Sequence, residues 1–285
     1  MLASSQSASH PAHHYPMRDW RQIEDPEQIL AVEERLARLP RLRVYEHPEL
    51  YELAYPGFPD DTEFYCRQAA TGAVLYLGVG TGRIFAALAR VNPGAIGLDS
   101  SEAMLRILRE RYPDIAREQV RLGSSADIEL PADSFDTIIA PFCFLEVMND
   151  RDRERTLVNV ARWLKPGGQF VTDTFSTFVI PFRKSGLETI AFSPIAGTDV
   201  EIFIRYDHCR QTMREATVLT RNGDSQVTEM DLHYAFPHEL SQAFRRAGLE
   251  EPGILGGYQG QPFLPSASEI IVYHTRRPRS AVRAS

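Results

Sequence analysis

Apolar runs and amphipathic helical patterns alternate regularly along the chain from Ala73 to about Thr174. The apolar runs are VLYL, AIGL, QVRL, DTIIA and QFVTDTF, and the helical patterns are RIFAALARV, SEAMLRILRERY and RDRERTLVNVARWL. Strands that alternate with helices of this length predict a parallel sheet with helices on both faces. With two later extended segments, around Ile254 and at SEIIVYHT, the alternation predicts an α/β fold with a Rossmann-like, doubly wound sheet of seven strands.

The flanking segments predict further parts of the chain. Helical patterns at DPEQILAVEERLARLP, ELYELAYP and DDTEFYCRQAA predict N-terminal helices, the first of which could act as a lid over a pocket or pack against a second subunit. Four extended segments with turn signals at Ala196-Gly197 and Asn222-Gly223 predict an antiparallel β insertion. The expected organisation is a disordered tail (1–24), a helical cap (25–72), a cofactor-binding core (73–177), the insertion (178–236), the rest of the core (237–275) and a tail (276–285).

Charge and cysteine content argue against several classes of partner. The chain has 285 residues, with 38 Asp and Glu against 31 Lys and Arg, which disfavours nucleic-acid binding because that depends on basic residues. Three scattered cysteines predict a reducing compartment rather than a disulfide framework. No apolar run approaches the roughly 18 to 20 residues that cross a bilayer, so we expect a cytoplasmic protein with no membrane partner. No ligand cluster for a metal is evident, and His10, His13 and His14 belong to the expected tail.

The segment VLYLGVGTGRIFAALA places three glycines between an apolar strand and a helix. Gly78, Gly80 and Gly82 allow a sharp turn and a close approach of the backbone to a ligand. Backbone N–H groups and the helix N-terminus would then face a polar or anionic group. Asp99 ends the next apolar run roughly 20 residues later, where a carboxylate can accept both ribose hydroxyls or, alternatively, cap the following helix. Together, the two features indicate an adenosine-containing ligand.

At this point the chain resembles the class I S-adenosylmethionine-dependent methyltransferases, from about Tyr51 to Thr275. The resemblance lies in LGVGTGR, GLDSSEAML, VRLGSSADIELPADSFD, IIAPFCFLEV and LKPGGQFVTDTF. LYELAYPGF, DTEFY and GGYQGQPFLPSASEIIVY resemble the small-molecule branch of that family. The resemblance implies a methyltransferase that uses S-adenosyl-L-methionine, leaves S-adenosyl-L-homocysteine and methylates a metabolite or natural product.

The resemblance also implies which residues contact the cofactor. They lie on an N-terminal tyrosine helix, the glycine loop, the next two strand ends and the opening of the fourth strand: Tyr51, Gly78, Val79, Gly80, Thr81, Asp99, Ser100, Met104, Ser124, Ser125, Pro141 and Phe142. For Met104, an apolar core position is an equal alternative. The family usually has an acidic residue at Tyr76, where it binds the methionine ammonium, and Asp at Ser124. Loss of a charged acceptor typically costs about 1.5 to 3 kcal/mol, so binding would weaken unless Glu146 or Asp173 replaces the missing carboxylate.

Methyl transfer depends mainly on positioning, which can supply about 7 to 11 kcal/mol, although an acceptor can also need a base. The candidate catalytic residues are Tyr65, Glu146 and Asp173, with turn capping as an alternative for Asp173; His208 and His233 are expected to be exposed on insertion strands. The acceptor pocket is expected between the N-terminal helices and the insertion, lined by Tyr55, Phe64, Phe144, Phe175, Tyr234 and Tyr258.

Two other classes of function compete with methyl transfer. A methyltransferase-like cyclase or isomerase would keep the donor bound without transferring its methyl group. A nicotinamide-dependent oxidoreductase or a non-catalytic binder is disfavoured, because the glycine loop lacks the usual dinucleotide spacing. The expected partner is a small-molecule acceptor, and the chain would act as a monomer or homodimer.

Overall fold

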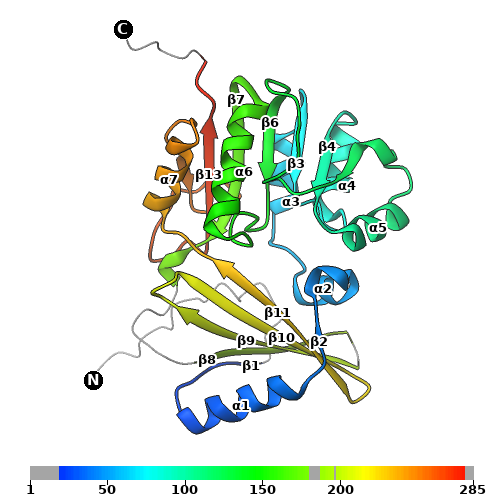
Figure 1. The fold of residues 1–285 in the computed structure, drawn as a ribbon, viewed down its shortest axis with the longest axis vertical. Helices are drawn as coiled ribbons and strands as arrows, with labels where there is room; N and C mark the ends of the chain where they lie inside the picture. The colour runs from blue at the N-terminus through cyan, green and yellow to red at the C-terminus, as the bar shows by residue number, and fades with distance from the viewer. Residues whose placement is uncertain (1–18, 180–186, 196, 280–285) are drawn as a thin grey trace.

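The structure is a computed structural model that describes residues 19–179, 187–195 and 197–279. It contains two sheets, one above the other in Figure 1. The upper body is the predicted α/β core, and the lower body is a second sheet with one helix against it, antiparallel except where one edge strand pairs in parallel with its neighbour. The histidines at 10, 13 and 14 and Ala196 lie outside the described residues.

The core sheet has seven strands in the order β12-β13-β7-β6-β3-β4-β5. Its strands are β3 (Val74–Leu77), β4 (Ile96–Asp99), β5 (Val120–Leu122), β6 (Phe135–Ala140), β7 (Leu164–Phe175), β12 (Gly253–Leu255) and β13 (Ile270–Arg276). The first five strands in sequence pair in parallel, whereas β13 runs antiparallel to β7 and β12 antiparallel to β13. The Rossmann-like fold class predicted from the alternation is therefore confirmed.

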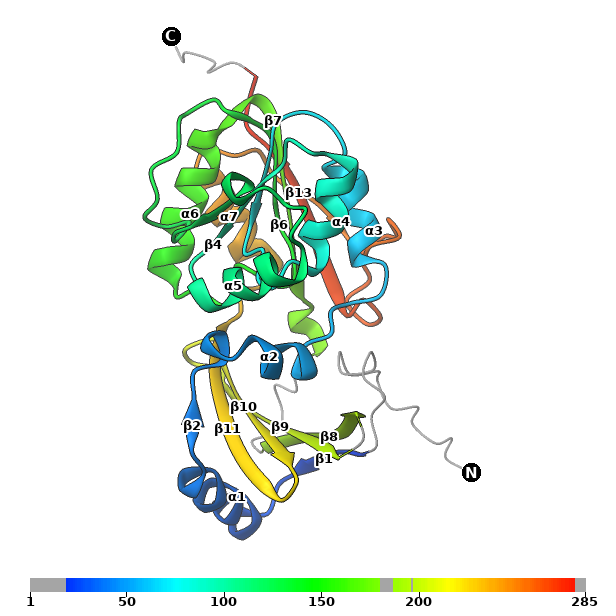
Figure 2. The same ribbon diagram turned by 90° about the vertical axis from the view of Figure 1, so that its right-hand side faces the viewer.

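Helices cover both faces of the core sheet (Figure 2), because successive strand residues point to opposite sides. These helices are α3 (Asp61–Gln68), α4 (Arg83–Val91), α5 (Glu102–Arg111), α6 (Asp150–Trp163) and α7 (Pro237–Arg246). On β3, Tyr76 packs with the side chains of α3, α4 and α5, whereas Leu75 and Leu77 pack with those of α6 and α7. The core therefore consists of two apolar layers with the sheet between them.

The second sheet has the strand order β1-β8-β9-β10-β11-β2. Its strands are β1 (Asp19–Ile23), β2 (Arg41–Leu42), β8 (Leu187–Ile195), β9 (Thr198–Asp207), β10 (Thr212–Arg221) and β11 (Asp224–His233). The β10–β11 hairpin turns at Asn222 and Gly223, both with positive φ, as the sequence predicts. The prediction of a disordered tail as far as residue 24 is wrong for Asp19–Ile23, because these residues form β1 and pair with β8.

The predicted helical cap is divided among three places. Helix α1 (Pro26–Arg38) packs its apolar side chains, among them Ile29 and Leu36, against Phe203 and Val218 of the second sheet. It lies on the side of that sheet away from the core, so it does not cover the glycine loop as a lid. Helix α2 (Pro48–Ala54) lies between the two bodies, and α3 belongs to the core.

Candidate active site

Two cavities flank the loop between β3 and α4. The first, about 290 Å³, extends over the ends of β4 and β5 and the first turn of α5, and we call it the β4 cavity. The second, about 270 Å³, lies between α2, the loop and the start of α4, and we call it the α2 cavity. Tyr51, Gly78, Gly80 and Phe142 line both cavities, so the two volumes meet at the glycine loop.

The glycine loop exposes its backbone to these cavities. Gly78 and Gly80 have φ of 76° and 55°, in the left-handed region that glycine adopts without strain. A Cβ at Gly78 would lie 2.4 Å from the Phe144 ring, which fixes glycine there. At Gly80 a Cβ would meet nothing within 4 Å, so open space lies directly over its backbone. A ligand can therefore approach the main chain at Gly80 closely.

Asp99 lines the β4 cavity, and backbone hydrogen bonds hold its carboxylate in place. Its Oδ2 accepts the Gly80 N–H (2.7 Å) and its Oδ1 accepts the Ser101 N–H (2.8 Å). Burial raises the pKa of Asp99, while these backbone donors and that of Ser100 act in the opposite direction. The helix cap is Ser101, whose hydroxyl accepts the Met104 N–H at 3.2 Å, so the alternative in which Asp99 caps α5 is wrong. A carboxylate has about four lone-pair sites, so Asp99 can accept a hydroxyl donor in addition to these backbone donors.

The far end of the β4 cavity combines an apolar surface with small polar groups. Met104 is buried and lines this cavity with Ser124 and Ser125. The Ser125 hydroxyl is 2.9 Å from the Thr156 hydroxyl, which leaves the role expected of Ser125 to its backbone. Asn149, the cap of α6, lines the same end. An apolar surface beside such polar groups suits a planar heterocycle with polar edges.

The structure brings all twelve predicted cofactor residues to the walls of these two cavities. The β4 cavity is lined by Tyr51, Gly78, Gly80, Asp99, Ser100, Met104, Ser124, Ser125, Pro141 and Phe142, and Val79 and Thr81 line the α2 cavity. Their contact with a cofactor remains a prediction.

The charged groups of the α2 cavity differ from those expected. Tyr76 lines this cavity where the related family usually has an acid, and Glu146 and Asp173, the expected replacements, line neither cavity. Its charged residues are instead Arg83, Glu52 and Arg111. Arg111 pairs with Glu52 through both guanidinium Nη atoms. The structure therefore places neither expected replacement carboxylate in the two cavities.

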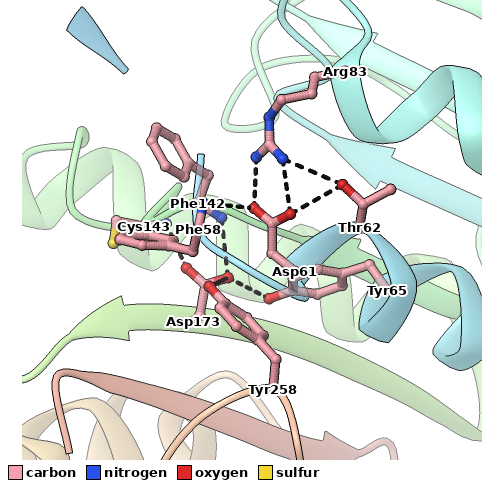
Figure 3. A network of polar contacts seen from close by, with 9 residues as sticks. All are labelled: Phe58, Asp61, Thr62, Tyr65, Arg83, Phe142, Cys143, Asp173 and Tyr258. Atoms are coloured by element: carbon pink, nitrogen blue, oxygen red, sulfur yellow. Dashed lines mark hydrogen bonds and ion pairs between the residues drawn. The ribbon is translucent and has the colours of Figure 1, made fainter. Parts of the chain in front are cut away.

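Asp173 instead holds the segment that follows β6 (Figure 3). Its Oδ2 accepts the Phe142 N–H (3.0 Å) and its Oδ1 accepts the Cys143 N–H (2.6 Å). The hydroxyls of Tyr65 (2.5 Å) and Tyr258 (3.1 Å) also donate to Oδ2. Phe142 and Cys143 have φ of 62° and 55°, a conformation that non-glycine residues adopt only when it is held in place.

These contacts change the roles expected of Tyr65 and Asp173. Both are fully buried, and burial raises the pKa of Asp173 while its hydrogen bonds lower it. Burial and the neighbouring carboxylate raise the pKa of Tyr65 well above its usual range, so it acts as a donor rather than a base. Their geometry suits positioning of the Phe142 wall rather than proton transfer at either cavity.

Glu146, the third expected catalytic residue, is also buried. Its Oε2 accepts the Phe175 N–H at 3.2 Å, and Cys143 is a further hydrogen-bond partner. Among the described residues, no partner reaches its Oε1. Burial raises the pKa of Glu146 well above its usual range, which favours the protonated form. A protonated, enclosed carboxyl does not suit a general base.

A family comparison agrees with the strand order and the glycine loop. Residues 74–168 match the family model described as a methyltransferase domain. The match covers 95 residues, about one third of the chain, and all of them lie within the core. The matched segment begins at β3 and ends within β7, so it contains the glycine loop and Asp99.

Curated relatives of the chain align over different lengths. A demethylmenaquinone methyltransferase of Tropheryma whipplei is 38% identical over 114 residues, which are 39% of this chain and 46% of that protein. The chain therefore spans less than half the length of that relative. A cypemycin N-terminal methyltransferase of Streptomyces sp is 26% identical over 207 residues, which are 72% of this chain and 83% of that protein.

Solved methyltransferase structures share the fold over most of the chain. The CcbJ methyltransferase from Streptomyces caelestis superposes with a TM-score of 0.72 at 24% identity, over 83% of this chain and 98% of that one. The S-adenosylmethionine-bound amino pentose methyltransferase CalS10 from Micromonospora echinaspora gives a TM-score of 0.60 at 21% identity, over 83% and 97%. At these identities the likeness shows the fold.

The aromatic residues expected to line one acceptor pocket are split between four places in this structure. Tyr55 lines the α2 cavity and Phe144 the β4 cavity. Phe64 and Tyr258 pack against each other, with ring centroids 5.6 Å apart, and both contact Tyr65. The Phe175 and Tyr234 rings pack together at 6.5 Å. The last four are buried and line neither cavity.

The two insertion histidines are not the exposed strand residues expected. His208 lies in the turn after β9, where its Nδ1 is 3.0 Å from the Tyr234 hydroxyl and its ring stacks on Tyr206. His233 ends β11 and donates its backbone N–H to the Glu146 carbonyl. Both are half-buried. Within residues 19–179, 187–195 and 197–279, no His, Cys, Asp and Glu side chains cluster as a metal site, and no helix could span a bilayer.

Sequence reasoning missed Arg83, Glu52 and Tyr45 at the cavities. A signal existed for two of them. Arg83 is the first residue after the three glycines, and Glu52 follows the predicted Tyr51 directly. Tyr45 lies in a short 3-10 helix (Val44–Glu46), and its ring centroid is 5.9 Å from that of Tyr51.

Proposed function

We propose that this protein is an S-adenosylmethionine-dependent methyltransferase that methylates a small molecule and releases S-adenosylhomocysteine. The observation that carries this proposal is the pair of cavities that meet at the bare backbone of Gly80, with the Asp99 carboxylate beside it. The methyltransferase-domain match and the methyltransferase folds of the solved structures support it. A cyclase or isomerase reaction gains no support from any relative described above.

The residues present fit the cofactor. The β4 cavity offers Asp99 to the ribose hydroxyls and the buried Met104 to the adenine ring. The α2 cavity, on the other side of the loop, would take the amino-acid part. The sulfur would lie where the cavities join, beside Tyr51 and Phe142, because it links the two parts of the molecule.

The cofactor supplies a methyl group on a positively charged sulfur, and the protein positions it. Asp173 fixes the backbone of Phe142 and Cys143, and thereby the wall shared by the two cavities. Tyr65 and Tyr258 hold that carboxylate in turn. Alignment of donor and acceptor is enough to supply about 7 to 11 kcal/mol of the barrier reduction.

An amine is the first acceptor class to test. The relatives and neighbours include the cypemycin N-terminal methyltransferase and the sugar N-methyltransferase KedS8. The abundance of aromatic side chains on α2 and around the Phe142 wall supports an acceptor with apolar or ring-bearing parts. We further propose a cytoplasmic monomer or homodimer, in line with the few, unpaired cysteines.

The test is a reaction of the purified protein with S-adenosylmethionine and a panel of amino sugars, peptides with free N-termini and hydroxylated aromatics. We expect acceptor-dependent formation of S-adenosylhomocysteine and a product heavier by one methyl group in place of a hydrogen, both detected by mass spectrometry. A rearranged product of unchanged mass would support the cyclase or isomerase instead. Absence of calorimetric binding of both S-adenosylmethionine and S-adenosylhomocysteine would rule out the proposed function.

A further inference from the structure

Arg83 holds a fixed guanidinium at the wall of the α2 cavity (Figure 3). Its Nη1 donates to Asp61 Oδ1 (2.8 Å) and its Nη2 donates to Asp61 Oδ2 (2.6 Å). Nη1 also donates to the Thr62 hydroxyl at 3.2 Å. Asp61 is 2% exposed and accepts the Phe58 N–H as well, so the carboxylate itself is fixed. This pairing orients the guanidinium without help from a ligand.

The guanidinium of Arg83 also packs against the main chain and against an aromatic ring. Gly57 has φ of 97°, and a Cβ there would lie 2.2 Å from Arg83 Cζ, so the main chain of Gly57 packs directly on the guanidinium. The Phe142 ring centroid lies 5.7 Å from the same atom. A guanidinium held by a carboxylate, a glycine backbone and an aromatic ring loses little conformational entropy when it binds a ligand.

One edge of the guanidinium remains for a ligand. Arginine has five N–H donors, and three of them are used by Asp61 and Thr62. The remaining two, on Nε and Nη2, lie on one edge with the spacing that a carboxylate accepts bidentately. Among the described residues, neither of these donors has a partner. The side chain is 37% exposed, and it lines the cavity together with Tyr51 and Tyr76.

Of the two arginines that line the α2 cavity, Arg83 is the one that can bind an anion there. Arg111 is paired with Glu52, which Thr81 also approaches as a hydrogen-bond partner. Asp61 lies behind Arg83 and does not line the cavity. The wall at Tyr76 has no carboxylate, so an anion there meets no nearby negative charge on β3.

We propose that Arg83 binds the α-carboxylate of the amino-acid part of S-adenosylmethionine through Nε and Nη2, with Asp61 as a positioning residue. In this chain, recognition of the amino-acid end of the cofactor would then depend on its carboxylate. In the related family, the acidic residue that usually stands in place of Tyr76 would instead recognise the ammonium. This inference rests on the proposed function, because it requires that the cofactor occupies both cavities.

The test is isothermal titration calorimetry with two ligands, S-adenosylhomocysteine and 5′-methylthioadenosine, which lacks the amino-acid part. We expect Arg83→Gln to weaken S-adenosylhomocysteine binding by about 10- to 100-fold, because two charge-assisted hydrogen bonds are lost. Binding of 5′-methylthioadenosine should stay within about twofold of the wild type. The matched control is Arg67→Gln, which removes a cation that is paired with Glu63 on α3 and lines neither cavity, so it should change neither affinity by more than about twofold.

Removal of Arg83 leaves a buried carboxylate unpaired, so the single variant could fail to fold. The double variant Asp61→Asn/Arg83→Gln replaces the ion pair by neutral amides, and 5′-methylthioadenosine binding reports whether its β4 cavity is intact. We expect the double variant to discriminate between the two ligands as Arg83→Gln does. Equal S-adenosylhomocysteine affinity in wild type and variants would overturn the inference alone, whereas no binding of either ligand to the wild type would overturn the proposed function.

Discussion

The two cavities beside the glycine loop are built from different parts of the chain. In the β4 cavity the charged group is Asp99 at a strand end, braced by the backbone of Gly80 and Ser101. In the α2 cavity Glu52 comes from a helix outside the core, and Arg83 is oriented by Asp61 of α3. One side of the site is therefore fixed by the sheet itself, and the other depends on helices packed against it. The second side is free to differ between proteins that share the core.

Replacement of Asp99 gives the largest expected effect. We expect Asp99→Ala to weaken binding of S-adenosylhomocysteine and of 5′-methylthioadenosine alike by about 100-fold, because both ligands carry the ribose hydroxyls. Calorimetry with the two ligands measures this directly. The contrast with Arg83→Gln, which should affect only one ligand, separates the roles of the two cavities.

Asp99→Asn is the control, because it keeps an acceptor oxygen of the same shape and should lose less affinity than Asp99→Ala. Circular dichroism establishes whether each variant is folded, since Asp99 also binds two backbone N–H groups. If Asp99→Ala binds 5′-methylthioadenosine as tightly as the wild type, the ribose does not lie in the β4 cavity.

Alanine substitutions in the glycine loop, which both cavities share, should give a smaller effect, and that effect is on the stability of the fold. Gly78 and Gly80 both have left-handed backbone, so alanine at either position is strained by a similar amount. Only at Gly78 does the new Cβ also collide with Phe144. We expect the free energy of unfolding of Gly78→Ala to be about 2 kcal/mol lower than that of Gly80→Ala, as measured by urea denaturation.

The double variant Gly78→Ala/Phe144→Ala tests the cause of that difference. The Phe144→Ala substitution removes the ring that the new Cβ meets. The double variant should therefore lose less stability than the sum of the losses of the two single variants. Additive effects would mean that the loss at Gly78 comes from backbone strain alone. Gly80→Ala should instead lower affinity for both ligands, because its Cβ points into open space over the loop.

The difference between the cavities also explains what could be predicted from sequence. The strands, the glycine loop and Asp99 form one continuous pattern in which each residue's place follows from its neighbours along the chain. Parallel strands bring their carboxyl ends to one edge of the sheet, so the walls of the β4 cavity were predictable. The partnership of Arg83 with Asp61 joins the core to a helix before it, and no periodicity specifies which side chains meet there.

Long-range pairing and side-chain direction account for the errors. Strand β1 pairs with β8, which lies far along the sequence, and α1 then follows β1 onto the second sheet. The sequence predicts Asp173 as a candidate catalytic residue, because it lies at the end of an apolar run beside the expected cleft. In the structure, Tyr65 of α3 and the segment after β6 surround its carboxylate. Sequence identifies a carboxylate at a strand end, but tertiary packing decides which groups it contacts.

Glu146 lies outside both cavities, and its replacement should leave ligand affinity within about twofold of the wild type while changing the pH dependence of stability. Burial raises the pKa of Glu146 in the folded state. Between the unfolded and folded pKa values, the folded protein keeps a proton that the unfolded chain releases. The free energy of unfolding therefore falls with rising pH, by up to about 1.4 kcal/mol per pH unit in that window.

Glu146→Gln cannot titrate but keeps an oxygen for the Phe175 N–H. We therefore expect the variant to gain stability relative to the wild type between pH 5 and pH 8, as urea denaturation at both pH values would measure. Glu146→Ala, which opens a cavity, should instead be less stable at both. A constant difference between Glu146→Gln and the wild type would mean that the buried carboxyl does not hold its proton. A loss of S-adenosylhomocysteine affinity would mean that the cofactor site extends beyond the two cavities to the end of β7.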